Sequence, residues 1–143
     1  MNDWNTMAYN YYTNDIKLKP GALQYLLKLK ELGIKIGLAT SNSMHLLTTT
    51  LKSNNAFELF DAITVTDEVE KSKSNPDIYL LAAKKLGVNP SECMVFEDII
   101  AAVYGAKLAG MKVTGVYDKH SEHQIDILKK ECDNYIYNYE DLI

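Results

Sequence analysis

The sequence predicts an α/β fold with a mainly parallel sheet, because short strand-like segments alternate with amphipathic helical segments along most of the chain. Five segments are rich in the β-branched and aromatic residues that favour strands. They are Ile34–Ala39, Ala62–Thr66, Cys93–Phe96, Val113–Tyr117 and Tyr135–Tyr137. Strands separated by helices imply right-handed crossovers, which place helices on both faces of the sheet. We therefore expect three layers, with the sheet in the middle.

Three helical segments precede or separate these strands. Gly21–Leu32 carries leucines at a spacing of about 3.6 residues, follows Pro20 and ends at Gly33. Asp77–Leu86 repeats this design and ends at Gly87. Small apolar residues dominate Ile99–Leu108, as expected for a helix that packs closely on a sheet.

The first 18 residues depart from this alternation. Apolar residues recur there at helical spacing, which predicts an amphipathic helix unusually rich in aromatic side chains. The residues of this stripe are Trp4, Met7, Ala8, Tyr11 and Tyr12. The stripe either packs on its own domain or covers another chain.

Composition and charge limit the kinds of partner. The chain has 143 residues, 47% apolar and 24% charged, and a formal net charge of -4, which gives no electrostatic reason to expect nucleic acid. No basic leader and no membrane-spanning apolar run are present, so we expect a cytoplasmic protein with no membrane partner. With only Cys93 and Cys132, neither a disulfide framework nor a zinc site is indicated.

Polar residues follow or precede the predicted elements at two places suited to anions. Thr40, Ser41 and Asn42 end the first predicted strand, where a hydroxyl and free backbone amides can bind an anion. They would equally serve as an ordinary helix cap. Lys73 stands in the loop before Asp77–Leu86 and can neutralise a phosphate, although alone it is typical of a solvated surface lysine.

An acidic pair, Glu97 and Asp98, ends the strand Cys93–Phe96. Two like charges at the end of an apolar strand are costly unless a cation uses them, so the pair indicates a divalent metal site. His45, His120 and His123 lack ligand spacing and are expected at the surface.

In this order, the hydroxyl, the lysine and the acidic pair resemble the second, third and fourth motifs of haloacid dehalogenase-like phosphohydrolases. The sequence motifs are similar to those of the β-phosphoglucomutase-like branch over about residues 15 to 143. The segments that carry the resemblance are Lys19–Ala22, Gly37–Asn42, Phe60–Ile63, Lys73–Tyr79, Val95–Asp98, Gly105–Ala106 and Ala109–Met111.

The resemblance implies a Rossmann-like core and a role for each site residue. Thr40 would hold the phosphoryl group, helped by the backbone of Ser41 and Asn42. Lys73 would balance charge, Asp98 would ligate Mg²⁺, and Glu97 would orient metal-bound water.

One family feature is missing from this sequence. In the family, a first strand in the middle of the sheet carries an attacking aspartate and, two residues later, an acid aspartate, and a helical cap follows it. No such pair follows an apolar strand near the amino end here. We therefore expect residues 1–18 to be the remnant of a cap helix and residues 19–143 to be a partial core without its first central strand. Either a second polypeptide or direct pairing of the two flanking strands would close the gap.

Two functions agree with these residues. The first is a phosphatase or phosphomutase core that acts on a phosphorylated small molecule once an amino-terminal Asp-x-Asp piece is supplied. The alternative is an inactive phosphate-binding or interaction domain. We expect weak or no Mg²⁺ binding by the chain alone, and either an amino-terminal partner chain or a homodimer.

Overall fold

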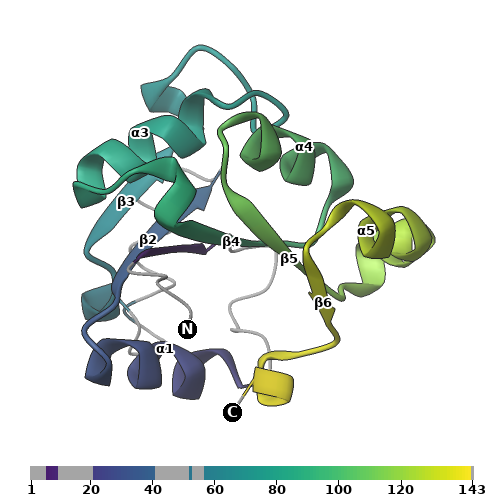
Figure 1. The fold of residues 1–143 in the computed structure, drawn as a ribbon, viewed down its shortest axis with the longest axis horizontal. Helices are drawn as coiled ribbons and strands as arrows, with labels where there is room; N and C mark the ends of the chain where they lie inside the picture. Colours follow the sequence, from purple (N-terminus) through teal and green to yellow (C-terminus); the bar gives the residue numbers. More distant parts are fainter. Residues whose placement is uncertain (1–5, 10–20, 41–51, 53–56, 143) are drawn as a thin grey trace.

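The computed structural model describes residues 6–9, 21–40, 52 and 57–142, and it shows a single sheet between helices (Figure 1). Its six described strands are all parallel to their neighbours and lie in the order β3-β2-β1-β4-β5-β6. The strands are β1 (Thr6–Tyr9), β2 (Lys35–Thr40), β3 (Ala62–Val65), β4 (Cys93–Glu97), β5 (Lys112–Val116) and β6 (Asn134–Ile136). All five predicted strands are confirmed, with ends that differ by at most one residue.

The helices are α1 (Ala22–Glu31), α3 (Asp77–Leu86), α4 (Ile100–Leu108) and α5 (Ile125–Glu131). The three helices predicted from the sequence correspond to α1, α3 and α4. Gly87 ends α3 in the left-handed conformation, with φ of 73°, as its place in the sequence predicts. The seven-residue α5 is too short to show a clear period and was not predicted.

The helices cover both faces of the sheet, which confirms the three layers (Figure 1). Side chains of the central strand β4 alternate between two apolar clusters. Met94 and Phe96 pack on the α1 side, while Val95 packs with α3 and α4 residues on the other. Because every residue of β4 is buried, its first four residues, Cys93 to Phe96, form a continuous apolar run that ends at the buried Glu97. None of the helices in the described ranges is both long and apolar enough to cross a membrane.

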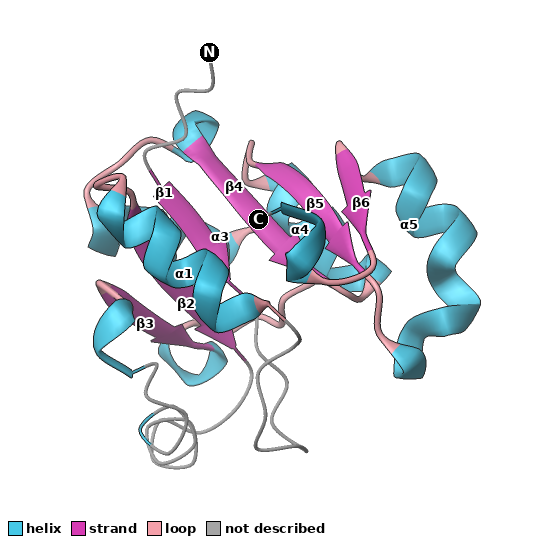
Figure 2. Ribbon diagram, turned by 90° about the horizontal axis from the view of Figure 1, so that it is seen from below, coloured by secondary structure: helices cyan, strands magenta, loops and turns pink. Residues whose placement is uncertain are grey.

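The amino-terminal residues that the structure describes form a strand, so the predicted helix is wrong for Thr6–Tyr9. Figure 2 shows β1 between β2 and β4 in the middle of the sheet. Thr6 lies opposite Lys35 and Cys93, and Tyr9 lies opposite Leu38 and Phe96. Three members of the predicted stripe, Trp4, Tyr11 and Tyr12, fall outside the described residues.

The predicted absence of a central strand is therefore also wrong. The chain itself occupies the position between β2 and β4, so neither a second polypeptide nor direct pairing of these two strands closes the sheet. The physical reason is that two buried strand flanks without partners would leave rows of backbone donors and acceptors unsatisfied. Pairing on both sides outweighs the helical spacing of the segment, because tertiary context overrides local propensity.

Candidate active site

The predicted site residues gather at the carboxyl edge of the sheet, where open α/β sheets bind ligands. Thr40 ends β2, and Glu97 ends β4 and is followed by Asp98. All three residues are at most 4% exposed. Between them β1 ends at Tyr9, level with Leu38 and Phe96, two residues short of Thr40 and Asp98. The site thus surrounds the end of the central strand.

Lys73 reaches this edge from the loop that precedes α3. Its ammonium nitrogen lies 2.5 Å from Glu97 Oε2 and 3.5 Å from the backbone oxygen of Ala39, which it donates to. Only 8% of the residue is exposed, so Lys73 is not a solvated surface lysine. Burial lowers the pKa of Lys73, while the carboxylates of Glu97 and Asp98 oppose that shift. Lys73 therefore joins the ends of β2 and β4.

Tyr79 of α3 supplies a second donor to Glu97. Its hydroxyl donates to Glu97 Oε2 over 2.6 Å, and the whole residue is buried. Tyr79 lies in the segment Lys73–Tyr79 that carries the family resemblance, but the sequence analysis assigned it no role. The pattern that could have revealed its role is a tyrosine on the inner face of a helix, because a buried tyrosine hydroxyl usually has a hydrogen-bond partner.

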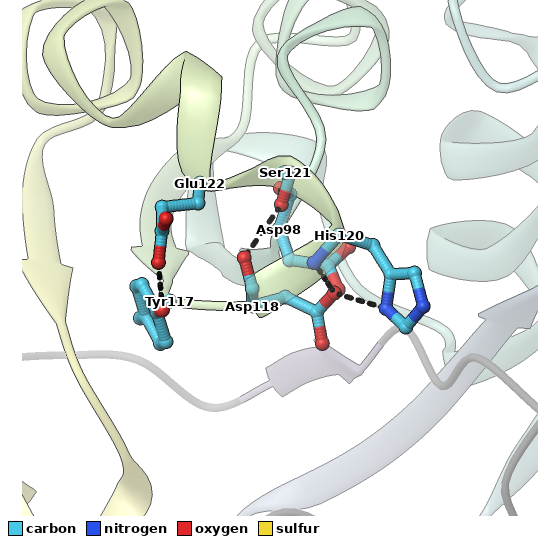
Figure 3. A network of polar contacts seen from close by, with 6 residues as sticks. All are labelled: Asp98, Tyr117, Asp118, His120, Ser121 and Glu122. Carbon is cyan, nitrogen blue, oxygen red and sulfur yellow. Dashed lines mark hydrogen bonds and ion pairs between the residues drawn. The ribbon is translucent and has the colours of Figure 1, made fainter.

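The segment after β5 holds the turn that contains Asp98 (Figure 3). The Ser121 hydroxyl donates to the backbone oxygen of Asp98 over 2.6 Å. The Gln124 side chain accepts from the backbone N–H of Ile100, at the start of α4, over 3.0 Å. Sequence reasoning missed both residues, since they come from another strand's loop and form no motif with Asp98.

Two predicted phosphate-binding residues, Ser41 and Asn42, lie outside the described residues, as does His45. His120 is exposed, with its Nδ1 3.3 Å from an oxygen of Asp118 (Figure 3), and His123 is exposed as well. These two histidines confirm the expectation of surface positions.

The acidic pair fits Mg²⁺ by its chemistry, because carboxylate oxygens are the ligands that this ion prefers and one or two commonly suffice beside phosphate and water. Glu97 Oε2 already accepts from Lys73 and Tyr79, which favours Asp98 as the direct ligand. No group of three or more His, Cys, Asp or Glu side chains that could hold a metal occurs in the described part of the chain. Among the described residues, Glu97 and Asp98 are thus two carboxylates that could contribute to a metal site, without forming a complete cage.

Comparison with known proteins identifies the family. Residues 3–110 match the model of the haloacid dehalogenase-like hydrolases. The chain belongs to this family. The resemblance read from the motifs is thereby confirmed, and solved structures of its β-phosphoglucomutase-like branch share the fold.

Three similar proteins illustrate the match. "Putative phosphatase YhcW" of Bacillus subtilis is 47% identical over 103 residues, which are 72% of this chain and 47% of that protein. CbbY of Rhodobacter sphaeroides, solved in complex with phosphate, has a TM-score of 0.80 at 26% identity, over 87% of this chain and 56% of that one. β-Phosphoglucomutase of Clostridium difficile has a TM-score of 0.73 at 27% identity, over 88% of this chain and 52% of that one. The chain thus spans about half the length of such relatives.

Proposed function

We propose that this chain is the phosphate-binding part of a phosphatase or phosphomutase core, which acts through an aspartyl-phosphate when an Asp-x-Asp segment is supplied. The observation that carries the proposal is the buried Lys73, held between the ends of β2 and β4 beside Glu97. A buried ammonium at the carboxyl edge of a parallel sheet is costly unless it is paired, and it is suited to balancing phosphoryl charge. Family membership and the phosphatase relative support the same reaction class.

Each site residue has a role in this proposal. The Thr40 hydroxyl would donate to a phosphoryl oxygen, and Lys73 would neutralise charge on the phosphoryl group. Asp98 would hold Mg²⁺ with Glu97 beside it. The two carboxylates and the Lys73 ammonium group together carry a net negative charge. Bound Mg²⁺ would make the net charge of the site positive. Phosphate binding is therefore expected to depend on Mg²⁺.

The covalent step needs a carboxylate that the central strand of this chain does not carry. Because β1 already pairs with both β2 and β4, a supplied segment would have to displace β1 or reach the carboxyl edge from outside the sheet. Neither Thr6–Tyr9 nor the five residues that follow it, Asn10 to Asn14, include an aspartate or glutamate. In the proposed step a supplied aspartate forms the bond to phosphorus, the ester bond to the leaving oxygen breaks, and the second aspartate donates a proton to that oxygen.

A phosphatase assay tests the proposal. The chain is incubated with para-nitrophenyl phosphate and Mg²⁺, with and without a peptide or protein that carries an Asp-x-Asp segment. We expect turnover only with the added piece, and none when Lys73→Ala or Asp98→Ala replaces the normal chain. Mg²⁺-dependent turnover by the chain alone that disappears in Lys73→Ala would overturn the need for a second piece.

The alternative function is phosphate binding without catalysis, and the lack of a carboxylate in β1 favours it. It predicts that inorganic phosphate with Mg²⁺ shifts the NMR signals of Thr40 and Lys73 while no added piece restores turnover. Phosphate-induced shifts confined to other parts of the chain would remove the site assignment itself.

A further inference from the structure

Gly105 lies in the middle of α4, on a buried part of the helix. Glycine inside a helix is less favourable than alanine, because it loses more conformational freedom on folding and has no side chain to pack. A buried helical glycine therefore indicates that another part of the molecule occupies the space that a side chain at this position would fill.

The backbone of the Lys73 loop occupies that space. A Cβ atom on Gly105 would lie 1.9 Å from the backbone oxygen of Lys73 and 2.8 Å from that of Asn75. Both are far inside van der Waals contact. A hydrogen bond from the Asn75 N–H to the Ser72 oxygen, over 3.0 Å, closes this loop into a turn. Since the obstructing atoms belong to the backbone, no rotation of a side chain can relieve the overlap.

The same loop determines where the Lys73 side chain begins. The backbone of this loop packs on α4. The Lys73 side chain extends from it into the site, where its ammonium nitrogen lies 2.5 Å from Glu97 Oε2 and Lys73 is 8% exposed. The loop leads directly into α3, whose Tyr79 hydroxyl donates to the same oxygen. A displacement of the turn away from α4 would carry the origin of the lysine side chain with it.

We propose that Gly105 is a positioning residue of the anion site: its missing side chain lets the Lys73 backbone rest on α4 and so places the ammonium group against Glu97. Gly105 touches neither phosphate nor metal in this account. The use made of the ammonium group rests on the proposed function, whereas its placement does not.

The variant Gly105→Ala tests the proposal, with Gly37→Ala as its matched control. A Cβ at Gly37 would also meet a close neighbour, Leu86 Cδ1 at 2.8 Å, but that atom ends a flexible side chain away from the lysine loop. The first readout is the ¹H–¹⁵N signal of the Lys73 ammonium group, which is visible when a buried ion pair slows its exchange with water. The second is the affinity for inorganic phosphate with Mg²⁺.

We expect the Lys73 ammonium signal to be visible in the wild-type protein and in Gly37→Ala. In folded Gly105→Ala we expect this signal to be lost. Phosphate affinity should fall by about tenfold or more in Gly105→Ala, because a charge-assisted contact is lost or lengthened. It should stay within about twofold in Gly37→Ala, which leaves that contact in place. A folded Gly105→Ala protein that keeps both the ammonium signal and the affinity would overturn the inference.

Two further results separate this inference from the proposed function. If the normal chain binds no phosphate, the proposed function fails, and loss of the ammonium signal in Gly105→Ala still supports the inference. If Gly105→Ala does not fold, NOEs in the normal chain decide the matter: contacts from the Gly105 Hα protons to the amide protons of Ser74 and Asn75 support it. Their absence would overturn it.

Discussion

At the scale of single residues, the site depends on buried polar groups that hold one another. Glu97 Oε2 accepts from both Lys73 and Tyr79, and the Asp98 backbone accepts from Ser121. Groups of this kind stabilise the fold only while their partners remain, because a buried polar atom that loses its partner keeps the full cost of desolvation.

Replacing Tyr79 by phenylalanine should destabilise the protein by about 1.5–3 kcal/mol, the usual value of a hydrogen bond to a charged group. The change removes only the hydroxyl that donates to Glu97. Urea unfolding of Tyr79→Phe measures the loss. Tyr104→Phe, at a residue of α4 that is 40% exposed, serves as the control and should change little. Equal stability of the two variants would show that the bond to Glu97 contributes nothing.

Replacing Thr64 by valine should leave stability unchanged or raise it by about 1–2 kcal/mol, because a buried hydroxyl without a partner is costly. Thr64 of β3 is fully buried, and its hydroxyl has no hydrogen-bond partner among the described residues. Thr114→Val is the matched comparison, since the buried Thr114 hydroxyl donates to Met94 Sδ over 3.2 Å. Thermal unfolding should rank Thr64→Val above Thr114→Val, and the reverse order would contradict the prediction.

At the scale of elements, Asp61 ties α1 and β2 to the start of β3. Its Oδ2 accepts from Lys30 Nζ of α1 and from the backbone N–H of Ile36 of β2, each over 2.7 Å. Asp61 lies just before β3, at the amino end of that strand, away from the site at the carboxyl edge of the sheet. Burial raises the pKa of Asp61, but these two bonds and the charges of Lys30 and Lys35 outweigh it and lower the pKa.

The lowered pKa of Asp61 predicts how stability varies with pH. A carboxylate with a depressed pKa stabilises the fold fully above its unfolded pKa and loses that contribution as pH falls through its folded pKa. Because the pair with Lys30 is partly exposed, Asp61→Asn should cost only about 0.5–1 kcal/mol near pH 7. Urea unfolding between about pH 7 and 3 should show the difference shrinking at acidic pH. A difference that grows toward acidic pH would contradict the sign.

At the scale of the whole molecule, the central position of β1 joins the two halves of the sheet. Its residues pair with β2 on one side and with β4 on the other. The flanks of β2 and β4 that a second polypeptide was expected to fill are therefore occupied, and the edges of the described sheet are β3 and β6. A homodimer stays a prediction, which light scattering at high protein concentration can test.

Hydrogen exchange provides a test of β1. Amide protons of Met7, Ala8 and Tyr9 should exchange about as slowly as those of β4, since a strand paired on both sides opens only when the sheet does. Rapid exchange at these three residues, with slow exchange in β2 and β4, would contradict the central placement. The more exposed edge strand β6, with only three residues, is the internal control and should exchange faster.

The amino-acid sequence by itself determined the elements whose patterns are local. The periodic leucines of α1, the stop at Gly87 and the apolar run before Glu97 depend on neighbours in the chain, and the acidic pair lies at the strand end where it was expected. Only the tertiary structure decided that Thr6–Tyr9 is a central strand, because its hydrogen-bond partners lie about 30 and 90 residues away. The same holds for Tyr79, Ser121 and Gly105, whose roles depend on contacts between elements that no local period records.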